Sequence, residues 1–347
     1  MPTCAQQAQP ALYGLGIRTA FYLLWYGTIL AAWAAPSELP LLRLTTSLFI
    51  GGEFLSLAIL ASDATGADRI TVVDAYIMLL LTYGTCYALI PRYIWGALTG
   101  WNPFWDPGRW PRVPATGVFV VLELVGVLAV TSFQMWFWTS GRDGGGSDGV
   151  LCDNGGWGFF FAQVPIDAGL FVAVNIVFVV VVLVCATVGL GMWVGVCWPP
   201  RWIRRRERRF EREVWRAEER GEEYAWRRTL QFWASVVDTT VVSVVVVAVE
   251  LTVQWNGLNG VGDVDTAAQT IPLVVAGGLL ARVVYAWFFP AHDRKVRKAL
   301  SARRKGLVVR PEKGFGMPPG MDRVYVRQER VYVASETVEG GGEAAGA

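Results

Sequence analysis

Charged residues are scarce in this chain of 347 residues, where Asp, Glu, Lys and Arg together make up 17%. A typical soluble domain carries about 25%. Here 53% of the residues are hydrophobic, and the 17 Trp and 38 Gly fit the interfaces and helix contacts of a membrane protein. The net charge of +2 provides no general basic character, so we expect no nucleic-acid partner.

Histidine is almost absent, because His292 is the single one in the sequence. The five cysteines form no CxxC pair. A structural zinc site needs about four N or S ligands at short spacing, and a membrane cytochrome needs paired axial histidines. We therefore expect no metal and no cofactor. With one histidine and no readable nucleophile–base pair, we also expect that the protein is not an enzyme.

Long apolar runs dominate the first 290 residues. A helix needs about 20 apolar residues to cross the hydrocarbon core of a bilayer. The predicted fold is therefore all-α, a polytopic bundle of seven transmembrane helices. The seven runs cover 17–35, 44–62, 70–90, 115–138, 168–197, 230–255 and 271–290, and proline is expected to end the third at Pro91, the fifth at Pro199 and the seventh at Pro290.

The distribution of Lys and Arg predicts the orientation of the chain. With the N-terminus outside, the inside segments hold 24 Lys and Arg residues and the outside segments hold three. Basic residues collect on the cytoplasmic side of membrane proteins, so we expect an outside N-terminus and an inside C-terminus. The predicted parts are an extracellular segment 1–16, a transmembrane domain 17–290 and a basic, then disordered, cytoplasmic tail 291–347.

Several ionisable residues interrupt the predicted spans. From a rise of about 1.5 Å per residue, Glu53 lies at the middle of its run, Glu123 and Asp238 about 5–6 Å toward the inside, and Arg282 about 2 Å inward. These four side chains could share one deep layer. Arg282 can pair with one carboxylate, which leaves two deep acids that must be protonated, hydrogen-bonded, hydrated or bound to a cation.

Two readings of this deep layer remain open. Intramembrane ionisable residues are functional by default, so the layer could handle protons, cations or a small polar solute. Alternatively, protonated acids could act as interhelical hydrogen-bond glue. Asp74 and Glu250 lie nearer the outer surface and are expected to form a second, shallower group.

The inner face carries two basic segments. Residues 201–228 hold eleven Arg and seven Glu with apolar residues at near-heptad spacing, which predicts a cytoplasmic amphipathic helix. A second basic run, 293–305, follows the last span. Both suit anionic inner-leaflet lipids, and 201–228 could instead bind a cytoplasmic protein or remain solvated. The residues expected to contact lipid or partner are Arg204, Arg205, Arg208, Arg209, Arg212, Lys295 and Lys298.

Two short stretches carry a resemblance. The sequences "LYGLGIR" (12–18) and "CDNGGWGFFFA" (152–162) resemble uncharacterised multi-pass membrane proteins of filamentous ascomycete fungi. The resemblance implies no activity. It implies Cys4 and Cys152 as an outer-face pair and Arg18 as a residue of the outer mouth. The predicted topology also places both cysteines on the oxidising face, where they form either a disulfide or two free thiols.

The sequence thus favours an integral protein of the plasma membrane or another secretory-pathway membrane. The leading hypothesis is transport of protons, cations or a small polar solute through the deep acidic layer. The alternative is a receptor-like seven-helix sensor or membrane scaffold that binds a cytoplasmic partner through 201–228. A homo-oligomer is compatible with both hypotheses.

Overall fold

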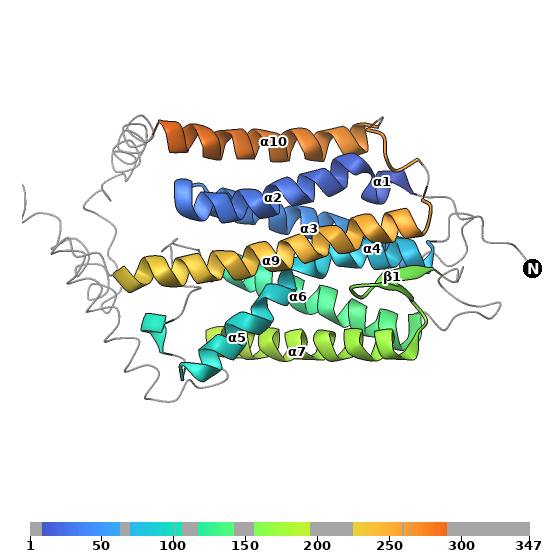
Figure 1. The fold of residues 1–347 in the computed structure, drawn as a ribbon, viewed down its shortest axis with the longest axis horizontal. Helices are drawn as coiled ribbons and strands as arrows, with labels where there is room; N and C mark the ends of the chain where they lie inside the picture. Colours follow the sequence, from blue (N-terminus) through green and yellow to red (C-terminus); the bar gives the residue numbers. More distant parts are fainter. Residues whose placement is uncertain are drawn as a thin grey trace, which may run out of the picture. The chain divides into compact units, whose positions relative to one another are not determined.

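The computed structural model describes residues 9–62, 70–100, 102–105, 117–141, 156–194, 225–258, 260–264 and 266–289. The chain divides into two units, 1–289 and 290–347, and all described residues belong to the first. The described part is a bundle of long helices that run alongside one another (Figure 1). The helices are α1 Pro10–Tyr13, α2 Leu15–Ala34, α3 Leu39–Ser62, α4 Val72–Tyr83, α5 Leu89–Leu98, α6 Gly117–Trp136, α7 Gly169–Val194, α9 Ala225–Trp255 and α10 Ala267–Phe288.

Several helices of this bundle are long enough to span a membrane. Within the described residues, six helical segments are long and apolar enough to cross a membrane. The prediction of a helical multi-pass membrane protein is therefore confirmed. The 20-residue helix α6 packs beside α7 in the same bundle. The six segments are Pro10–Ala34, Leu39–Ser62, Val72–Leu98, Gly169–Leu190, Arg228–Trp255 and Ala267–Phe288.

Helix α4 forms the centre of the bundle, since each of its 12 residues is buried. It packs against α3, α6 and α9, whereas α10 packs chiefly on α2 at the edge of the bundle. The lipid-compatible surface comes from outward-facing residues such as Leu48 on α3 and Val274 on α10, both about two-thirds exposed. The core thus lies around α4, and apolar side chains face outward at the rim, as a bilayer requires.

The third apolar segment changes its helix type in the middle and continues beyond Pro91. Helix α4 passes into the 3-10 helix Gly84–Ala88 and then into α5, which continues to Leu98. The expectation that Pro91 ends this segment is wrong. Pro91 is the third residue of α5, where the backbone N–H groups have no partner within the helix, so its missing N–H removes no helical hydrogen bond.

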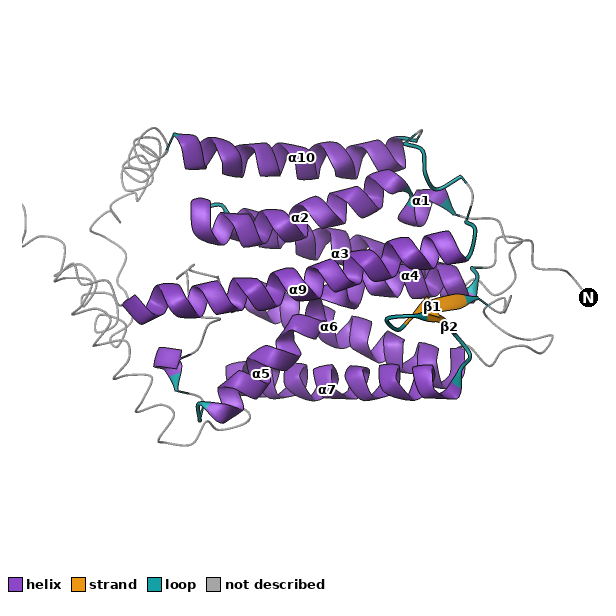
Figure 2. Ribbon diagram, in the orientation of Figure 1, coloured by secondary structure: helices purple, strands orange, loops and turns teal. Residues whose placement is uncertain are grey.

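A small β hairpin interrupts the otherwise helical fold (Figure 2). Strands β1 Trp157–Phe159 and β2 Gln163–Pro165 pair antiparallel, with Gly158 opposite Val164. The Asn256 side chain, just past α9, accepts from Trp157 N–H and donates to Trp157 C=O, each at 2.8 Å. This amide therefore pairs with the edge of β1 as a neighbouring strand would. We call this end of the bundle, where α2 also begins, the hairpin end, and the other the far end.

Candidate functional site

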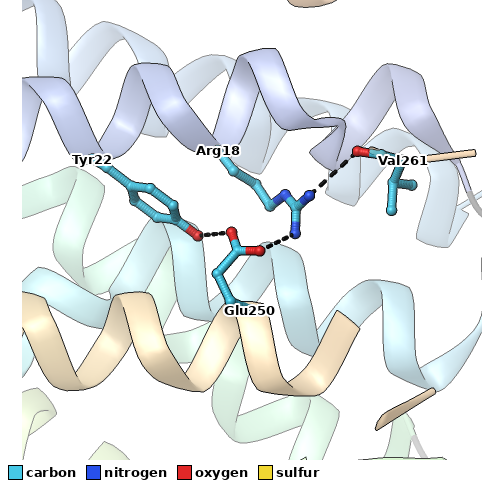
Figure 3. A network of polar contacts seen from close by, with 4 residues as sticks. All are labelled: Arg18, Tyr22, Glu250 and Val261. Atoms are coloured by element: carbon cyan, nitrogen blue, oxygen red, sulfur yellow. Dashed lines mark hydrogen bonds and ion pairs between the residues drawn. The ribbon is translucent and has the colours of Figure 1, made fainter. Parts of the chain in front are cut away.

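Charged side chains form an ion-paired group at the hairpin end (Figure 3). Arg18, in the first turn of α2, donates from Nη1 to Glu250 Oε2 of α9 at 3.0 Å and from Nη2 to the Val261 carbonyl at 3.3 Å. Tyr22, one turn along α2, donates its hydroxyl to Glu250 Oε1 at 2.8 Å. Both oxygens of Glu250 are therefore bonded to α2.

Burial makes this pair asymmetric. The Arg18 side chain is 3% exposed and that of Glu250 is 43% exposed. An isolated guanidinium cannot lose its charge, and leaving it buried without a counter-charge is costly. Glu250 is thus the neutralising partner of a cation enclosed between α2, α9 and the loop before α10.

The stretch 12–18, on which the fungal resemblance partly rests, has a clear packing role. A Cβ atom on Gly14 would come within 2.4 Å of the Gln269 side chain, and one on Gly16 within 2.4 Å of the Gln269 backbone oxygen. The N–H of Leu15 donates to the Val261 carbonyl at 2.9 Å. Glycine is therefore required for α2 to approach α10 so closely. The resemblance itself stays a prediction.

Asp74 has a structural role that is separate from Glu250. It is 1% exposed and forms a capping box with Thr71 at the start of α4. The Tyr13 hydroxyl donates to its other carboxylate oxygen. Asp74 and Glu250 both lie at the hairpin end, but they belong to two separate networks. Both networks include a residue of the N-terminal stretch 12–18, Tyr13 in one and Arg18 in the other.

A second charged group lies toward the far end. Arg92 of α5 donates from Nη2 to Asp238 Oδ2 of α9. Arg43 of α3 interacts electrostatically with Asp238 and Glu123, and Glu123 of α6 also interacts with Arg92. Two bases and two acids from four helices therefore share this region.

The expectation that Arg282 pairs with a deep carboxylate is wrong. Its Nε lies 2.7 Å from Oε2 of Glu38, in the turn before α3. The Glu38 side chain is 6% exposed and that of Arg282 is 61% exposed. The long Arg282 side chain reaches along α10 to the far end, where Glu38 is fixed, rather than across the bundle.

Glu53 differs from the other acids in the predicted deep layer. It lies in α3, half-buried, beside residues such as Leu57, which is fully buried. Among the described residues, it has no ion pair, no hydrogen bond and no charge acting on it. From the hairpin end of each helix, Glu250 is about 7 Å deep, Glu53 about 13 Å and Asp238 about 25 Å.

The structure therefore divides the predicted layer of four. Asp238 and Glu123 share the far-end group, Arg282 belongs to the turn at Glu38, and Glu53 remains alone. The partners that the sequence does not predict are Arg92 and Arg43, which lie just outside the predicted runs 70–90 and 44–62. Both residues belong to helices that extend past the predicted runs, Arg43 to α3 and Arg92 to α5.

Other predicted sites lie outside the described residues. They include Cys4 and Cys152 of the expected outer pair and the basic residues from Arg204 to Arg212, with Lys295 and Lys298. Of the predicted helix 201–228, only its last residues are described, as the first turn of α9. Cys86 and Cys185 are free thiols. No group of three or more His, Cys, Asp or Glu in the described part could hold a metal ion.

Comparison with protein-family models, with curated protein sequences and with solved structures finds no match for this chain.

Proposed function

We propose that this membrane protein moves protons or small cations across the bilayer and that Glu53 is the group that binds the ion. In this proposal the chain crosses the membrane seven times, α6 included, with the hairpin end outside. The excess of Lys and Arg in the alternate segments supports that orientation. We also propose that the protein is not an enzyme and that it resides in the plasma membrane or another membrane of the secretory pathway.

One observation carries the proposal, namely the isolation of Glu53 among the described residues. Among the other acids of the described long helices, Asp74, Asp238 and Glu250 accept hydrogen bonds from a base, a hydroxyl or a backbone N–H, and Glu123 lies within electrostatic reach of Arg43 and Arg92. A carboxyl group near the middle of a membrane without such a partner is neutral or holds a cation. It can therefore take up and release a proton, which a carboxylate held by an arginine does poorly.

The two ion-paired groups fit the role of gates on either side of Glu53. Glu250 and Asp238 both belong to α9, and each is held by an arginine from a different helix. Their depths place Glu53 between them. Opening one pair while the other stays closed would expose the central carboxyl to one side at a time, as alternating access requires.

The experiment is ion flux in sealed liposomes that contain the purified full-length protein, under imposed pH gradients and across a panel of cations. Glu53→Gln keeps the shape and removes the titratable group, whereas Glu53→Asp keeps a carboxyl. We expect flux in the wild type and in Glu53→Asp and none in Glu53→Gln. A folded wild type that carries no ion under any gradient, or undiminished flux in Glu53→Gln, would overturn the proposal.

A receptor-like sensor or membrane scaffold is the second candidate. The observation that favours it is the double attachment of α9, through Glu250 to α2 and through Asp238 to α5. Such a helix could transmit a change at one end to the other and on to residues 201–228. Absence of flux together with a cytoplasmic protein retained through 201–228 would favour this reading.

A further inference from the structure

The third segment is long enough to cross the bilayer before α5 begins. The 12 residues of α4 rise about 18 Å, and the five residues of the 3-10 helix Gly84–Ala88 add about 10 Å. Their sum of about 28 Å matches the roughly 30 Å hydrocarbon core. Helix α5, which adds ten residues, is therefore not needed for the crossing. It slants away from the direction of the long helices (Figure 1).

One face of α5 is apolar and exposed. Ile94 is 56% exposed and Leu98, one turn later, is 78% exposed. Trp95, beside them, is 41% exposed and donates its indole N–H to the backbone carbonyl of Trp105 at 2.7 Å; the Trp105 side chain is itself 46% exposed. Tryptophan collects at the boundary between hydrocarbon and headgroups.

The opposite face of α5 is polar and attached to the bundle. Arg92 holds Asp238 of α9. The Tyr93 hydroxyl lies against Gly189 of α7, where a Cβ atom would come within 2.6 Å of it. Helix α5 is thus short and amphipathic. Arg92 and Tyr93 contact protein and Leu89 and Ile90 pack on the core, whereas Ile94, Trp95 and Leu98 are left exposed by the described residues.

We propose that α5 lies in the lipid headgroup layer at the far end of the bundle, with Ile94, Trp95 and Leu98 inserted among the lipids. In this proposal the lipids of the bilayer surface cover the apolar face of α5. The argument rests on span length, on the tryptophans and on the separation of the two faces, which is the pattern of an interfacial helix. In this arrangement the Arg92–Asp238 pair anchors the helix to α9. The inference does not depend on ion transport.

The depth of a nitroxide label tests this proposal. The label is attached to Leu98→Cys or Leu48→Cys in the full-length protein with its five native cysteines replaced, reconstituted in lipid nanodiscs. Leu48, near the middle of α3, is 65% exposed and gives the reference for the hydrocarbon core. We expect the label at 98 to be less accessible to oxygen and more accessible to a water-soluble nickel chelate than the label at 48.

Three results would overturn the proposal: a label at 98 as deep as the label at 48, a label in bulk water, or a label shielded from both reagents by protein. Should the cysteine-free protein fail to fold, a photo-crosslinking amino acid at position 98 in the otherwise native chain replaces it, with a phospholipid adduct expected. Arg92→Gln removes the proposed anchor. It should increase the mobility of the label at 98 and leave the label at 48 unchanged, and equal mobility would refute the anchoring role.

Discussion

Substituting Glu250 and substituting Arg18, the two members of the hairpin-end ion pair, should lower the free energy of unfolding by different amounts. Glu250→Met leaves the guanidinium of Arg18, which is 3% exposed, with the Val261 carbonyl as its remaining partner. Arg18→Met leaves a carboxylate whose side chain is 43% exposed and which keeps the hydrogen bond from Tyr22. The same new side chain is introduced in both variants, so the difference reports the charge that is left behind.

The magnitudes follow from burial. Breaking a buried pair so that one charge remains unpaired costs about 3–5 kcal/mol, which is the loss we expect for Glu250→Met. For Arg18→Met we expect a smaller loss of about 1–3 kcal/mol, because the carboxylate left behind is half-exposed and keeps one hydrogen bond. The double variant Arg18→Met/Glu250→Met removes both charges and should be more stable than Glu250→Met alone, because apolar replacement of a buried pair is often neutral.

The assay is equilibrium unfolding of the purified protein in lipid–detergent micelles, analysed as a double-mutant cycle. Val247→Met serves as the control, because Val247 lies on α9 less than one turn away, is 46% exposed and forms no ion pair. The reasoning fails if Arg18→Met is the more damaging single change, or if the second substitution adds to the loss instead of relieving it.

Two further predictions test the packing at the hairpin end. Gly16→Ala should separate α2 from α10 and lower the unfolding temperature, because its Cβ atom would come within 2.4 Å of the Gln269 backbone. Gly27→Ala is the control and should be tolerated, because the nearest contacts of its Cβ atom are at 3.7 Å. Equal unfolding temperatures for the two variants would contradict the close approach. Asn256→Ala should remove both hydrogen bonds to Trp157, a local loss of about 1–3 kcal/mol, and raise hydrogen exchange in β1. Unchanged exchange would show that packing alone holds the hairpin.

Hydrophobic length was sufficient to predict where most of the helices lie. The described helices α2, α7 and α10 begin and end within a few residues of the predicted runs 17–35, 168–197 and 271–290. The sequence could not predict the break at Gly84, because that glycine is required by Val245 of α9, whose side chain would lie 2.4 Å from a Cβ atom there. Such a contact depends on tertiary packing.

The partners of the acids were harder to predict than their depth. Depth follows from position along one helix, but pairing depends on the rotation of each helix about its axis, which neighbouring helices determine. Because the predicted third run ends at residue 90, the sequence places Arg92 in a loop and leaves Asp238 without a base. The β hairpin was missed because "GGWGFFFAQVP" shows no alternation, and Asn256, which holds it, is far away in sequence.

The ion pair at the hairpin end also has a consequence for the synthesis of the protein. Arg18 and Glu250 are 232 residues apart. At about 5–20 residues per second, the first helix waits roughly 10–50 seconds before its counter-charge has been translated. Arg18 lies in the first turn of α2, so during this interval its side chain can reach the water at the membrane surface. The first helix can thus settle fully into the bundle only after the sixth apolar run has entered the membrane.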